Sequence, residues 1–416
     1  MTIFRLVTVL TGVSLCAQTI PVSEYKERRE QLRKQLEGST LVLFGETDDG
    51  LGDTRDGFFQ EPNFQYLTGW REPGAVLLMD GKSEILLLPQ RNVKRELFSG
   101  RMGAPEDADI VVRTGFGKVL ATEALESQLF KMLEGSARVL ILEGSPKTEK
   151  LKSMVALRKV SDALAMIAKL RAVKSKTELA LLQRSIDVTL DAHRAAWKRM
   201  QGGLFEYQVA RTLTGTYLEA GCERNAYPPI IGSGKNGTIL HYFKNTRRMD
   251  AGELLLMDAA AECGGYAADV TRTVPINGKF TARQREIYDI VLGAQKAAIA
   301  AVKPGITFSK SDPASLYRIA MDYINSHGKD LHGEPLGKYF THGLGHHVGL
   351  DVHDPFSSDL PLMEGAVITI EPGIYIPEEG IGVRIEDMVL VTATGGKLLS
   401  GALPRDAKEI ERALAK

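Results

Sequence analysis

Short apolar runs that stop at turn residues divide the first part of the chain. Four of these runs have the length and composition of buried strands. They are residues 41–45, 75–79, 84–89 and 139–143. A helical pattern lies between the last two runs, at 123–133. The strongly charged segment 22–38, with leucines on one helical face, predicts a surface helix. The mixture of strands and helices predicts an α/β domain that ends near residues 157–169.

The second part of the chain contains longer patterns that are typical of amphipathic helices. They span residues 175–200, 206–221 and 281–302. Pro304-Gly305 stops the last of them. We expect these helices to cover the outer face of an antiparallel sheet.

One strand pattern of this sheet ends in a carboxylate. Residues 252–258 run from a glycine through apolar positions to Asp258, and strand alternation places Leu254, Leu256 and Asp258 on one face. The turn Cys263-Gly264-Gly265 lets a returning strand bring Asp269 alongside. Because a buried unpaired charge is costly, we expect something cationic at Asp258.

The same pattern recurs once. Residues 365–371 match it position for position and end in Glu371, and the strand at 382–391 supplies Glu386 where the first copy supplies Asp269. Each copy offers a pair of carboxylates on a hairpin. The two halves therefore read as a pseudo-twofold duplication.

Composition and charge restrict the partners of the protein. Lys plus Arg balances Asp plus Glu at 52 each among 416 residues, so nothing favours nucleic acid or an anionic membrane as a partner. An Asp- and Gly-rich segment at 48–57 lacks the distal Glu of an EF-hand and predicts a solvated loop. We expect a small substrate.

The first residues predict an export signal. Arg5 supplies a positive charge, residues 6–15 an apolar run, and residues 16–18 a cleavage site, with cleavage after Ala17. The run is too short to anchor the mature chain stably in a membrane, so we expect a periplasmic or secreted protein. An apolar first element of the fold and lipid attachment at Cys16 are the alternatives. Cys222 and Cys263 remain after cleavage, and no disulfide can be inferred from that pair.

The candidate chemistry is that of a metal site. Four carboxylates and one imidazole, that of His346, suit hard or borderline divalent ions, and no cysteine is placed to add a thiolate. Four carboxylates around one divalent ion would leave surplus negative charge. Two ions that share bridging carboxylates give a better balance.

These residues resemble the ligands of the pita-bread, M24-type metallopeptidases, which include methionine aminopeptidase, aminopeptidase P and prolidase. The resemblance runs from about residue 172 to 398, in the contexts Met-Asp, Ala-Asp-Val-Thr-Arg, His-Gly-Leu-Gly-His, Ile-Glu-Pro-Gly-Ile-Tyr and Arg-Ile-Glu-Asp. It implies an α+β pita-bread domain with a pseudo-twofold antiparallel sheet covered by helices. It also implies two divalent ions, preferably Mn²⁺ with Co²⁺ or Zn²⁺ as alternatives. Asp258 would hold one ion, His346 and Glu371 the other, and Asp269 and Glu386 both.

Residues 64–70 resemble the N-terminal domain of the Pro-specific branch, which is expected to carry no metal ligand. After the predicted signal peptide at 1–17, the resemblance implies a creatinase/prolidase-like α/β domain at 18–170 and a catalytic pita-bread domain at 171–416. It also implies a homo-dimer or tetramer.

Three further histidines match positions that line the substrate site in the Pro-specific enzymes. The resemblance assigns His241, His342 and His353 to substrate binding, stabilisation of a tetrahedral oxyanion, or proton movement. The spacing of His342 and His346 is superficially that of a helical zinc site, but Gly343 stands where that site needs a Glu. Arg384 shares strand parity with Glu386, and we expect it to orient Glu386 or to contact substrate.

The leading functional hypothesis is a dimetal aminopeptidase that removes an N-terminal residue preceding proline. In this hypothesis Glu371 takes a proton from a metal-bridging water and returns it to the leaving nitrogen. The X-Pro bond is a tertiary amide without an N–H, so the site must grip the proline ring. The alternatives are an X-Pro dipeptidase (prolidase) and a non-catalytic pita-bread module that binds peptides.

Overall fold

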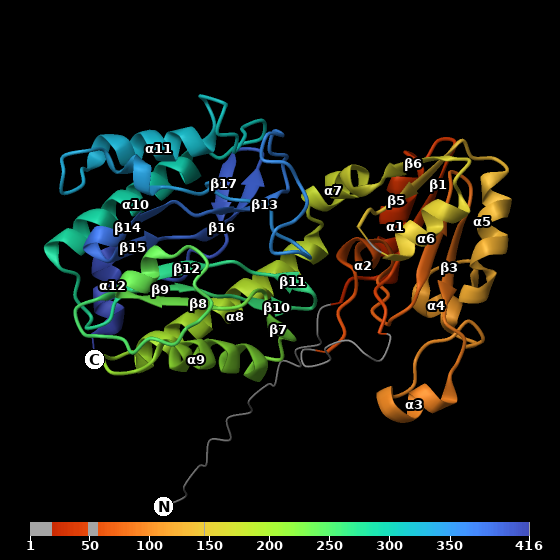
Figure 1. The fold of residues 1–416 in the computed structure, drawn as a ribbon, viewed down its shortest axis with the longest axis horizontal. Helices are drawn as coiled ribbons and strands as arrows, with labels where there is room; N and C mark the ends of the chain where they lie inside the picture. The colour runs from red at the N-terminus through yellow and green to blue at the C-terminus, as the bar shows by residue number, and fades with distance from the viewer. Residues whose placement is uncertain (1–18, 49–56, 145, 416) are drawn as a thin grey trace, which may run out of the picture.

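The protein was analysed as a computed structural model that describes residues 19–48, 57–144 and 146–415 (Figure 1). The predicted signal peptide and most of the predicted loop at 48–57 lie outside these residues. The described chain forms an N-terminal domain and a larger second domain, joined by helix α7 (Leu164–Ala172). The boundary predicted at 170/171 falls inside this helix.

The N-terminal domain contains one six-stranded mixed sheet in the order β4-β3-β2-β1-β5-β6. The strands are β1 (Ser39–Phe44), β2 (Val76–Met79), β3 (Glu84–Leu88), β4 (Val119–Ala121), β5 (Arg138–Ile141) and β6 (Lys159–Asp162). All four predicted strands are confirmed. Side chains alternate across the sheet: Val42 packs in a cluster with Leu129 and Leu133 of α5 (Leu125–Leu133), whereas Leu41 and Leu43 pack on the opposite side.

The charged helix α1 (Val22–Arg33) is not simply a surface helix, which corrects the prediction. Arg28 is 5% exposed and Arg29 is fully buried. Arg29 donates to the carbonyl of Leu67 at 2.9 Å, and Arg28 forms ion pairs with Glu24 at 2.6 Å and Glu178 at 3.3 Å. A guanidinium group can be buried when carboxylates and carbonyls satisfy its donors. Arg29 therefore holds α1 within the N-terminal domain, and Arg28 pairs across the interface between the domains.

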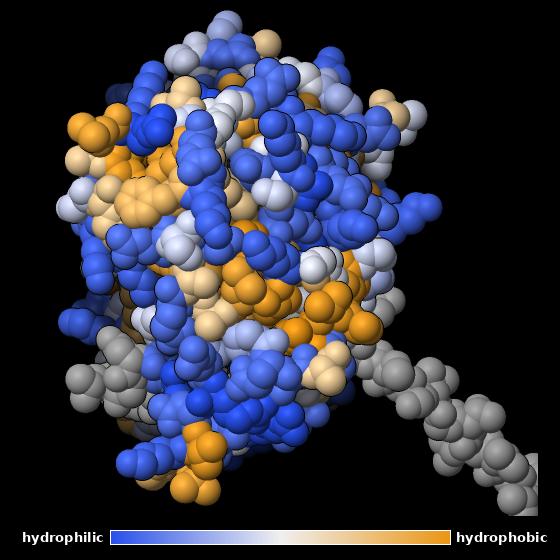
Figure 2. Space-filling model, turned by 90° about the vertical axis from the view of Figure 1, so that its right-hand side faces the viewer, coloured by the Kyte–Doolittle hydropathy of each residue, from blue (hydrophilic) through white to orange (hydrophobic). Residues whose placement is uncertain are grey.

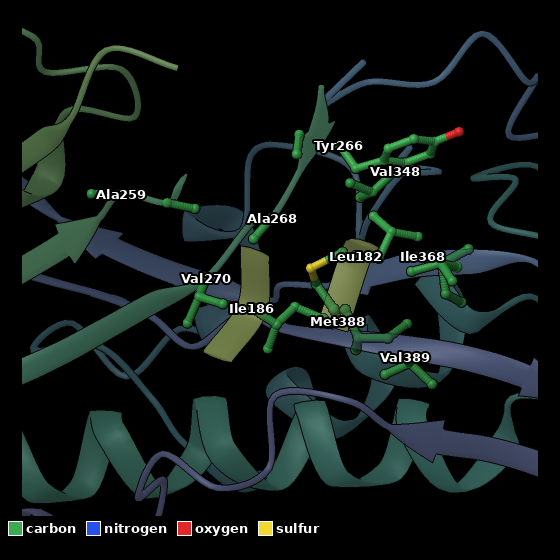
Figure 3. Close-up of a cluster of buried hydrophobic side chains, with 14 of the residues drawn as sticks. Leu182, Ile186, Ala259, Tyr266, Ala268, Val270, Val348, Ile368, Met388 and Val389 are labelled. Atoms are coloured by element: carbon green, nitrogen blue, oxygen red, sulfur yellow. The ribbon is translucent and has the colours of Figure 1, made fainter. Parts of the chain in front are cut away.

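Helices cover the second domain, and the three predicted ones are confirmed as α8 (Lys176–Arg199), α9 (Glu206–Glu219) and α10 (Ala282–Ala301). The helices α11 (Leu316–His327) and α12 (Ala407–Leu414) were not predicted. Ser175 and Glu178 begin α8 with a capping box. Figure 3 shows Leu182 and Ile186 of α8 packing in one cluster with Val270 and Met388, which come from the two halves of the domain. This core lies directly behind the strands that carry the predicted carboxylates.

Two hairpins form the duplicated centre of this domain. In the first, β9 (Leu254–Asp258) pairs with β12 (Thr271–Pro275); in the second, β13 (Val367–Ile370) pairs with β16 (Asp387–Thr392). The third strand differs, because β8 (Ile230–Ser233) lies beside β9, whereas β17 (Gly395–Leu398) lies beside β16. The duplication is thus confirmed for the hairpins and does not extend to their neighbours.

The predicted continuous strand at 382–391 is wrong in one respect. It is divided into β15 (Ile381–Arg384), which pairs with β14 (Gly373–Ile376), and β16. At the break, Glu386 N donates to the carbonyl of Thr271 at 3.1 Å, and Thr273 Oγ1 donates to the carbonyl of Arg384 at 3.0 Å. The break lets the chain leave its pairing with β14 and pair with β13. The bonds to Thr271 and Thr273 join it to β12 and so bring the two carboxylate pairs together.

Cys222 and Cys263 form a disulfide, which the sequence left open. It joins the segment just after α9 to the end of β10 (Ala261–Cys263). The bond closes a loop with a sequence separation of 41 residues. Such a cross-link restricts the unfolded chain.

The outward face of the N-terminal side is mixed in character. Figure 2 shows apolar groups in separate patches among charged side chains. Exposed apolar residues of this domain include Val93, Leu97 and Phe98, all on the short helix α3 (Val93–Ser99). Among the described residues, no helix has both the length and the apolar character needed to cross a membrane.

Removal of the disulfide should destabilise the fold without changing its topology. For a loop of this length, chain entropy predicts that a Cys222→Ser/Cys263→Ser variant loses about 4 kcal/mol of unfolding free energy. Thermal and denaturant unfolding followed by circular dichroism measure this loss. Dithiothreitol should destabilise the wild-type protein and leave the double variant unaffected; equal stability of the two proteins would contradict the prediction.

Candidate active site and metal centre

The structure brings all nine residues singled out by the sequence to one cavity of about 430 Å³ in the second domain. They are Asp258, Asp269, His346, Glu371, Glu386, His241, His342, His353 and Arg384. They come from both hairpins and from the loops beside them. The cavity is the point where the two halves of the duplication meet.

Asp258 and Asp269 lie together on the first hairpin. Asp258 ends β9 and pairs in register with Thr271, so Asp269 lies two residues before the start of β12. The hydroxyl of Tyr227 is 2.6 Å from Oδ1 of both aspartates. One phenolic proton can satisfy only one of two ionised carboxylates. This pair therefore requires further positive charge.

Glu371 and Glu386 occupy the equivalent places on the second hairpin. Glu371 follows β13, and Glu386 precedes β16. Thr271 Oγ1 donates to Glu386 Oε2 at 2.7 Å across the junction between the hairpins. Burial raises the pKa of Glu386 well above its usual value, and it raises the pKa of Glu371 to about 7.

His346 lies between the two pairs. Its Nε2 is 3.4 Å from Asp269 Oδ2 and 3.5 Å from Glu371 Oε1. Donor atoms of Asp269, His346 and Glu386 all lie within 4.8 Å of one another. Burial favours the neutral ring, but the carboxylates of Asp269 and Glu371 raise the pKa of His346 to about 9. The five predicted ligands thus form one electrostatic group.

Arg384 contacts a different carboxylate from the one we predicted. Its Nη2 donates to Asp258 Oδ2 at 2.6 Å, and its Nε donates to Thr271 Oγ1 at 3.2 Å. Thr271 in turn contacts Glu386, so Arg384 reaches Glu386 only through this hydroxyl. The break between β15 and β16 explains the difference, because the prediction placed Arg384 and Glu386 on one face of a single continuous strand.

His342 is held as a neutral ring. Arg384 Nη1 donates to the hydroxyl of Tyr375 at 2.8 Å, which leaves the proton of Tyr375 for His342 Nε2, also at 2.8 Å. The Nδ1 of His342 then donates to the carbonyl of Gly343 at 2.7 Å. Burial and the charge of Arg384 lower the pKa of His342 to about 3. Both ring nitrogens are engaged, so His342 offers the surface of its ring to the cavity.

The two remaining histidines lie nearer the solvent. The ring of His353 lies against that of His346, with centroids 3.9 Å apart and planes tilted by 31°. Burial together with His346 lowers the pKa of His353 to about 4. The ring of His241 lies 5.8 Å from that of Phe243. Apolar side chains complete the lining: Ile230, Leu240, Phe243 and Val352. The cavity therefore has an acidic floor and a partly apolar wall.

The sequence alone missed four hydroxyl groups that organise this site, those of Tyr227, Thr271, Thr369 and Tyr375. Thr369 Oγ1 accepts a hydrogen bond from His346 N at 3.0 Å and donates one to Glu371 Oε1 at 3.4 Å. Thr271 and Tyr375 stand inside the motifs Ala-Asp-Val-Thr-Arg and Ile-Glu-Pro-Gly-Ile-Tyr, which could have pointed to them. Tyr227 has no such signal.

The donor set fits divalent metal ions. Four buried carboxylates share the cavity, and the basic groups in direct contact with them are Arg384 and His346. Burial of like charges at this density is unfavourable without cations. Carboxylate oxygens with a single imidazole match the ligand preference of borderline and hard divalent ions.

The fold and the site together define a metal-dependent peptidase. Residues 180–393 match metallopeptidase family M24, and residues 25–141 match the aminopeptidase P N-terminal domain. The chain belongs to family M24 and has the pita-bread fold.

Individual relatives agree with this assignment. The Xaa-Pro aminopeptidase of Escherichia coli (strain K12) is 33% identical over 93% of this chain and 96% of its own length. A structure of a putative aminopeptidase P from Bacillus anthracis superimposes with a TM-score of 0.86 at 29% identity, covering 95% of this chain and 98% of that one. An aminopeptidase P from E. coli with the inhibitor Pro-Leu gives a TM-score of 0.85 at 31% identity, covering 95% and 98%.

Metal affinity should rise with pH. At neutral pH His346 holds a proton because its pKa is about 9, and Glu371, with a pKa of about 7, is partly protonated. A metal ligand must be deprotonated, so binding must release these protons and weaken as pH falls. Isothermal titration of the protein with Mn²⁺, in buffers of different ionisation enthalpy, measures both effects. His346→Ala should release fewer protons; pH-independent affinity in the wild type would contradict the assignment.

Proposed function

We propose that this protein is an Xaa-Pro aminopeptidase, which hydrolyses the bond between the first residue of a peptide and a following proline. The observation that carries the proposal is the convergence of His241, His342 and His353, with an apolar wall, around the five predicted ligands in one cavity. The similarity to Xaa-Pro aminopeptidases along more than nine-tenths of the chain supports it. The assignment of individual roles below is part of the proposal.

Asp258, Asp269, His346, Glu371 and Glu386 would hold the metal. We propose two ions, and Mn²⁺ as the preferred one, because the donor set is rich in oxygen. When bound, such ions would supply Lewis acidity and lower the pKa of a water molecule.

Glu371 is the proposed acid and base. Its Oε1 lies 3.5 Å from His346 Nε2, within the group of proposed ligands, so the carboxylate would lie beside an attacking water. Thr369 Oγ1 donates toward Glu371 Oε1, and the opposite oxygen faces His342 at 3.9 Å. In this position Glu371 can accept a proton from the attacking water and deliver it to the departing proline nitrogen.

His342 and the apolar wall are proposed to contact the proline ring. An X-Pro amide has no N–H to donate, so recognition must depend on the shape and apolar surface of the ring. His342 is neutral and has both nitrogens engaged, which makes it a wall rather than a proton carrier. His241 and His353 would donate to peptide carbonyls.

The mouth of the cavity favours longer peptides. Phe243 lines the cavity beside His241 and is 50% exposed. A chain that continues beyond proline can leave the site along this side chain. This openness supports an aminopeptidase over the dipeptidase alternative.

Peptide length and metal dependence test the proposed activity. With Mn²⁺, the protein should hydrolyse Ala-Pro-Ala-Ala at least as well as Ala-Pro, and EDTA should abolish turnover until Mn²⁺ is restored. Liquid chromatography of the products measures both.

Glu371→Gln should lower kcat by a factor of about 10³ or more, because it removes a general base and one metal-ligand charge. Turnover restricted to Ala-Pro would identify a dipeptidase, and peptide binding without turnover a non-catalytic module.

We also propose that the protein is exported. The signal-like first 17 residues support this, as does the disulfide between Cys222 and Cys263, because such bonds persist in oxidising compartments.

Export predicts a processed N-terminus. The full chain expressed in a bacterial host should appear in the periplasmic or medium fraction and begin at Gln18 by N-terminal sequencing. A variant with Leu10→Arg in the apolar run should remain in the cytoplasm, because a charge interrupts the signal. Cytoplasmic wild-type protein that retains Met1 would refute the proposal.

A further inference from the structure

Arg171 lies where three parts of the molecule meet. It belongs to α7, the helix between the two domains (Figure 1), and its side chain is 1% exposed. Its Nη1 donates to Asn63 Oδ1 at 2.7 Å in the N-terminal domain. Its Nη2 donates to Asp351 Oδ2 at 2.7 Å and to Asp354 Oδ1 at 2.6 Å in the second domain. A planar guanidinium group fixes the relative positions of such acceptors.

The N-terminal domain presents Asn63 in one orientation. Asn63 Nδ2 donates to Glu61 Oε1 at 2.8 Å, which leaves Oδ1 as the acceptor for Arg171. Glu61 also caps α2 (Pro62–Thr68) by accepting from Phe64 N at 2.6 Å. The start of α2 is therefore arranged to offer an acceptor to α7.

Asp351 and Asp354, the two carboxylates that Arg171 contacts, lie on either side of His353 in the chain. Only Val352 and His353 lie between Asp351 and Asp354, and both of them line the cavity. Asp351 N donates to Asp354 Oδ1 at 3.1 Å, and Asp354 N donates to the carbonyl of His347 at 2.9 Å. The segment 351–354 is thus a closed turn that is fixed from both ends. Its geometry sets the position of the His353 ring.

Lys174 strengthens the same arrangement. Its Nζ donates to Asp354 Oδ2 at 2.8 Å and to the carbonyl of Arg171 at 2.6 Å. Burial opposes the ionisation of Asp354, but Lys174 and Arg171 hold its pKa at about 2. A side chain at Gly349 would collide with the carboxylate of Asp354. The turn at 351–354 is therefore closely packed at Asp354, and Asp354 is charged throughout the neutral pH range.

We propose that Arg171 is a positioning residue through which the N-terminal domain controls His353 and hence peptide binding. Among the described residues that line the cavity, none belongs to the N-terminal domain, so its influence must travel through such a contact. The link runs from Asn63 through Arg171 to the turn that carries His353. This inference rests on the proposed function, because it takes His353 to be a peptide-binding group.

Hydrogen exchange tests the link without relying on activity. In Arg171→Met, the amides of Gly349, Asp351 and Asp354 should exchange faster, because the turn loses its shared partner. Asn63→Ala keeps both ion pairs of Arg171 and removes its bond to the N-terminal domain, together with the local bond from Asn63 to Glu61. It should therefore increase exchange in the same peptide to a smaller extent. Mass spectrometry measures the exchange. Unchanged exchange rates in both variants would overturn the proposal.

Arg28→Met is the matched control. Arg28 is also buried, and it also links the domains, because it lies in α1 and pairs with Glu178 at 3.3 Å. Its other polar contacts go to Glu24 and to the carbonyl of Tyr66, away from the His353 turn. The control should lower overall stability without faster exchange at 349–354. Equal exchange in the control and in Arg171→Met would show general domain loosening and overturn the proposal.

Kinetics then connect the turn to the reaction. With Ala-Pro-Ala-Ala and Mn²⁺, at a temperature where every variant is folded, Arg171→Met should lower kcat/KM by roughly a hundredfold, as a misplaced binding group does. Asn63→Ala should lower it by roughly tenfold, as loss of a hydrogen bond to a charged group does. Arg171→Lys should recover part of the loss, and Arg28→Met should remain near the wild-type value.

A double-mutant cycle identifies His353 as the intermediary. In a His353→Ala background, Arg171→Met should have little further effect on kcat/KM, because its target is already absent. If the two substitutions lower kcat/KM independently, so that their factors multiply in the double variant, the proposal is overturned. Wild-type protein that cleaves no X-Pro peptide, yet shows the predicted exchange pattern, would refute the proposed function and leave the structural link intact.

Discussion

The mutual repulsion of four buried carboxylates is the constraint on which the rest of the site depends. Asp258, Asp269, Glu371 and Glu386 enclose one cavity, and such a group is unstable unless positive charge and hydrogen-bond donors meet every oxygen. Arg384 supplies a fixed positive charge at Asp258, and His346 supplies a second between the two pairs. Hydroxyl groups donate hydrogen bonds to further carboxylate oxygens. The remaining negative charge is what suits the cavity to divalent cations and thereby to metal-dependent hydrolysis.

This cluster can exist because the two hairpins meet at the point where each strand pair ends. Each hairpin buries its apolar residues against the helices behind it and presents acidic residues at its end. The junction between β12 and β15 is made by Thr271 and Thr273, which use main-chain and hydroxyl groups to join the halves. Thr271 therefore has a structural and an electrostatic role, since its hydroxyl also contacts Glu386. The site is a property of the junction, which neither hairpin could form alone.

The N-terminal domain has its own charged contacts with this catalytic half. Arg28 reaches Glu178 from α1, and Asn63 reaches Arg171 from α2. These contacts give partners to buried guanidinium groups, whose charge would be costly to bury unpaired. They also explain why α1 is rich in charge and yet partly buried. The described residues of the N-terminal domain do not line the cavity, yet Asn63 is linked through Arg171 to the turn that holds His353.

The sequence by itself determined the classes of element, the duplicated hairpins and the set of nine cavity residues, because these depend on local periodicity and on motifs that are contiguous in the chain. The four predicted strands of the first domain and the long helices α8 and α10 follow from such local patterns. Only the tertiary structure decided that Arg384 contacts Asp258, that Cys222 meets Cys263, and that Tyr227 contacts two aspartates. Each of these pairs is distant in sequence, and its formation depends on how the strands break and pack. Periodicity specifies which face of an element is apolar, whereas the partner that it meets across the fold is fixed by the free energy of the whole packed chain.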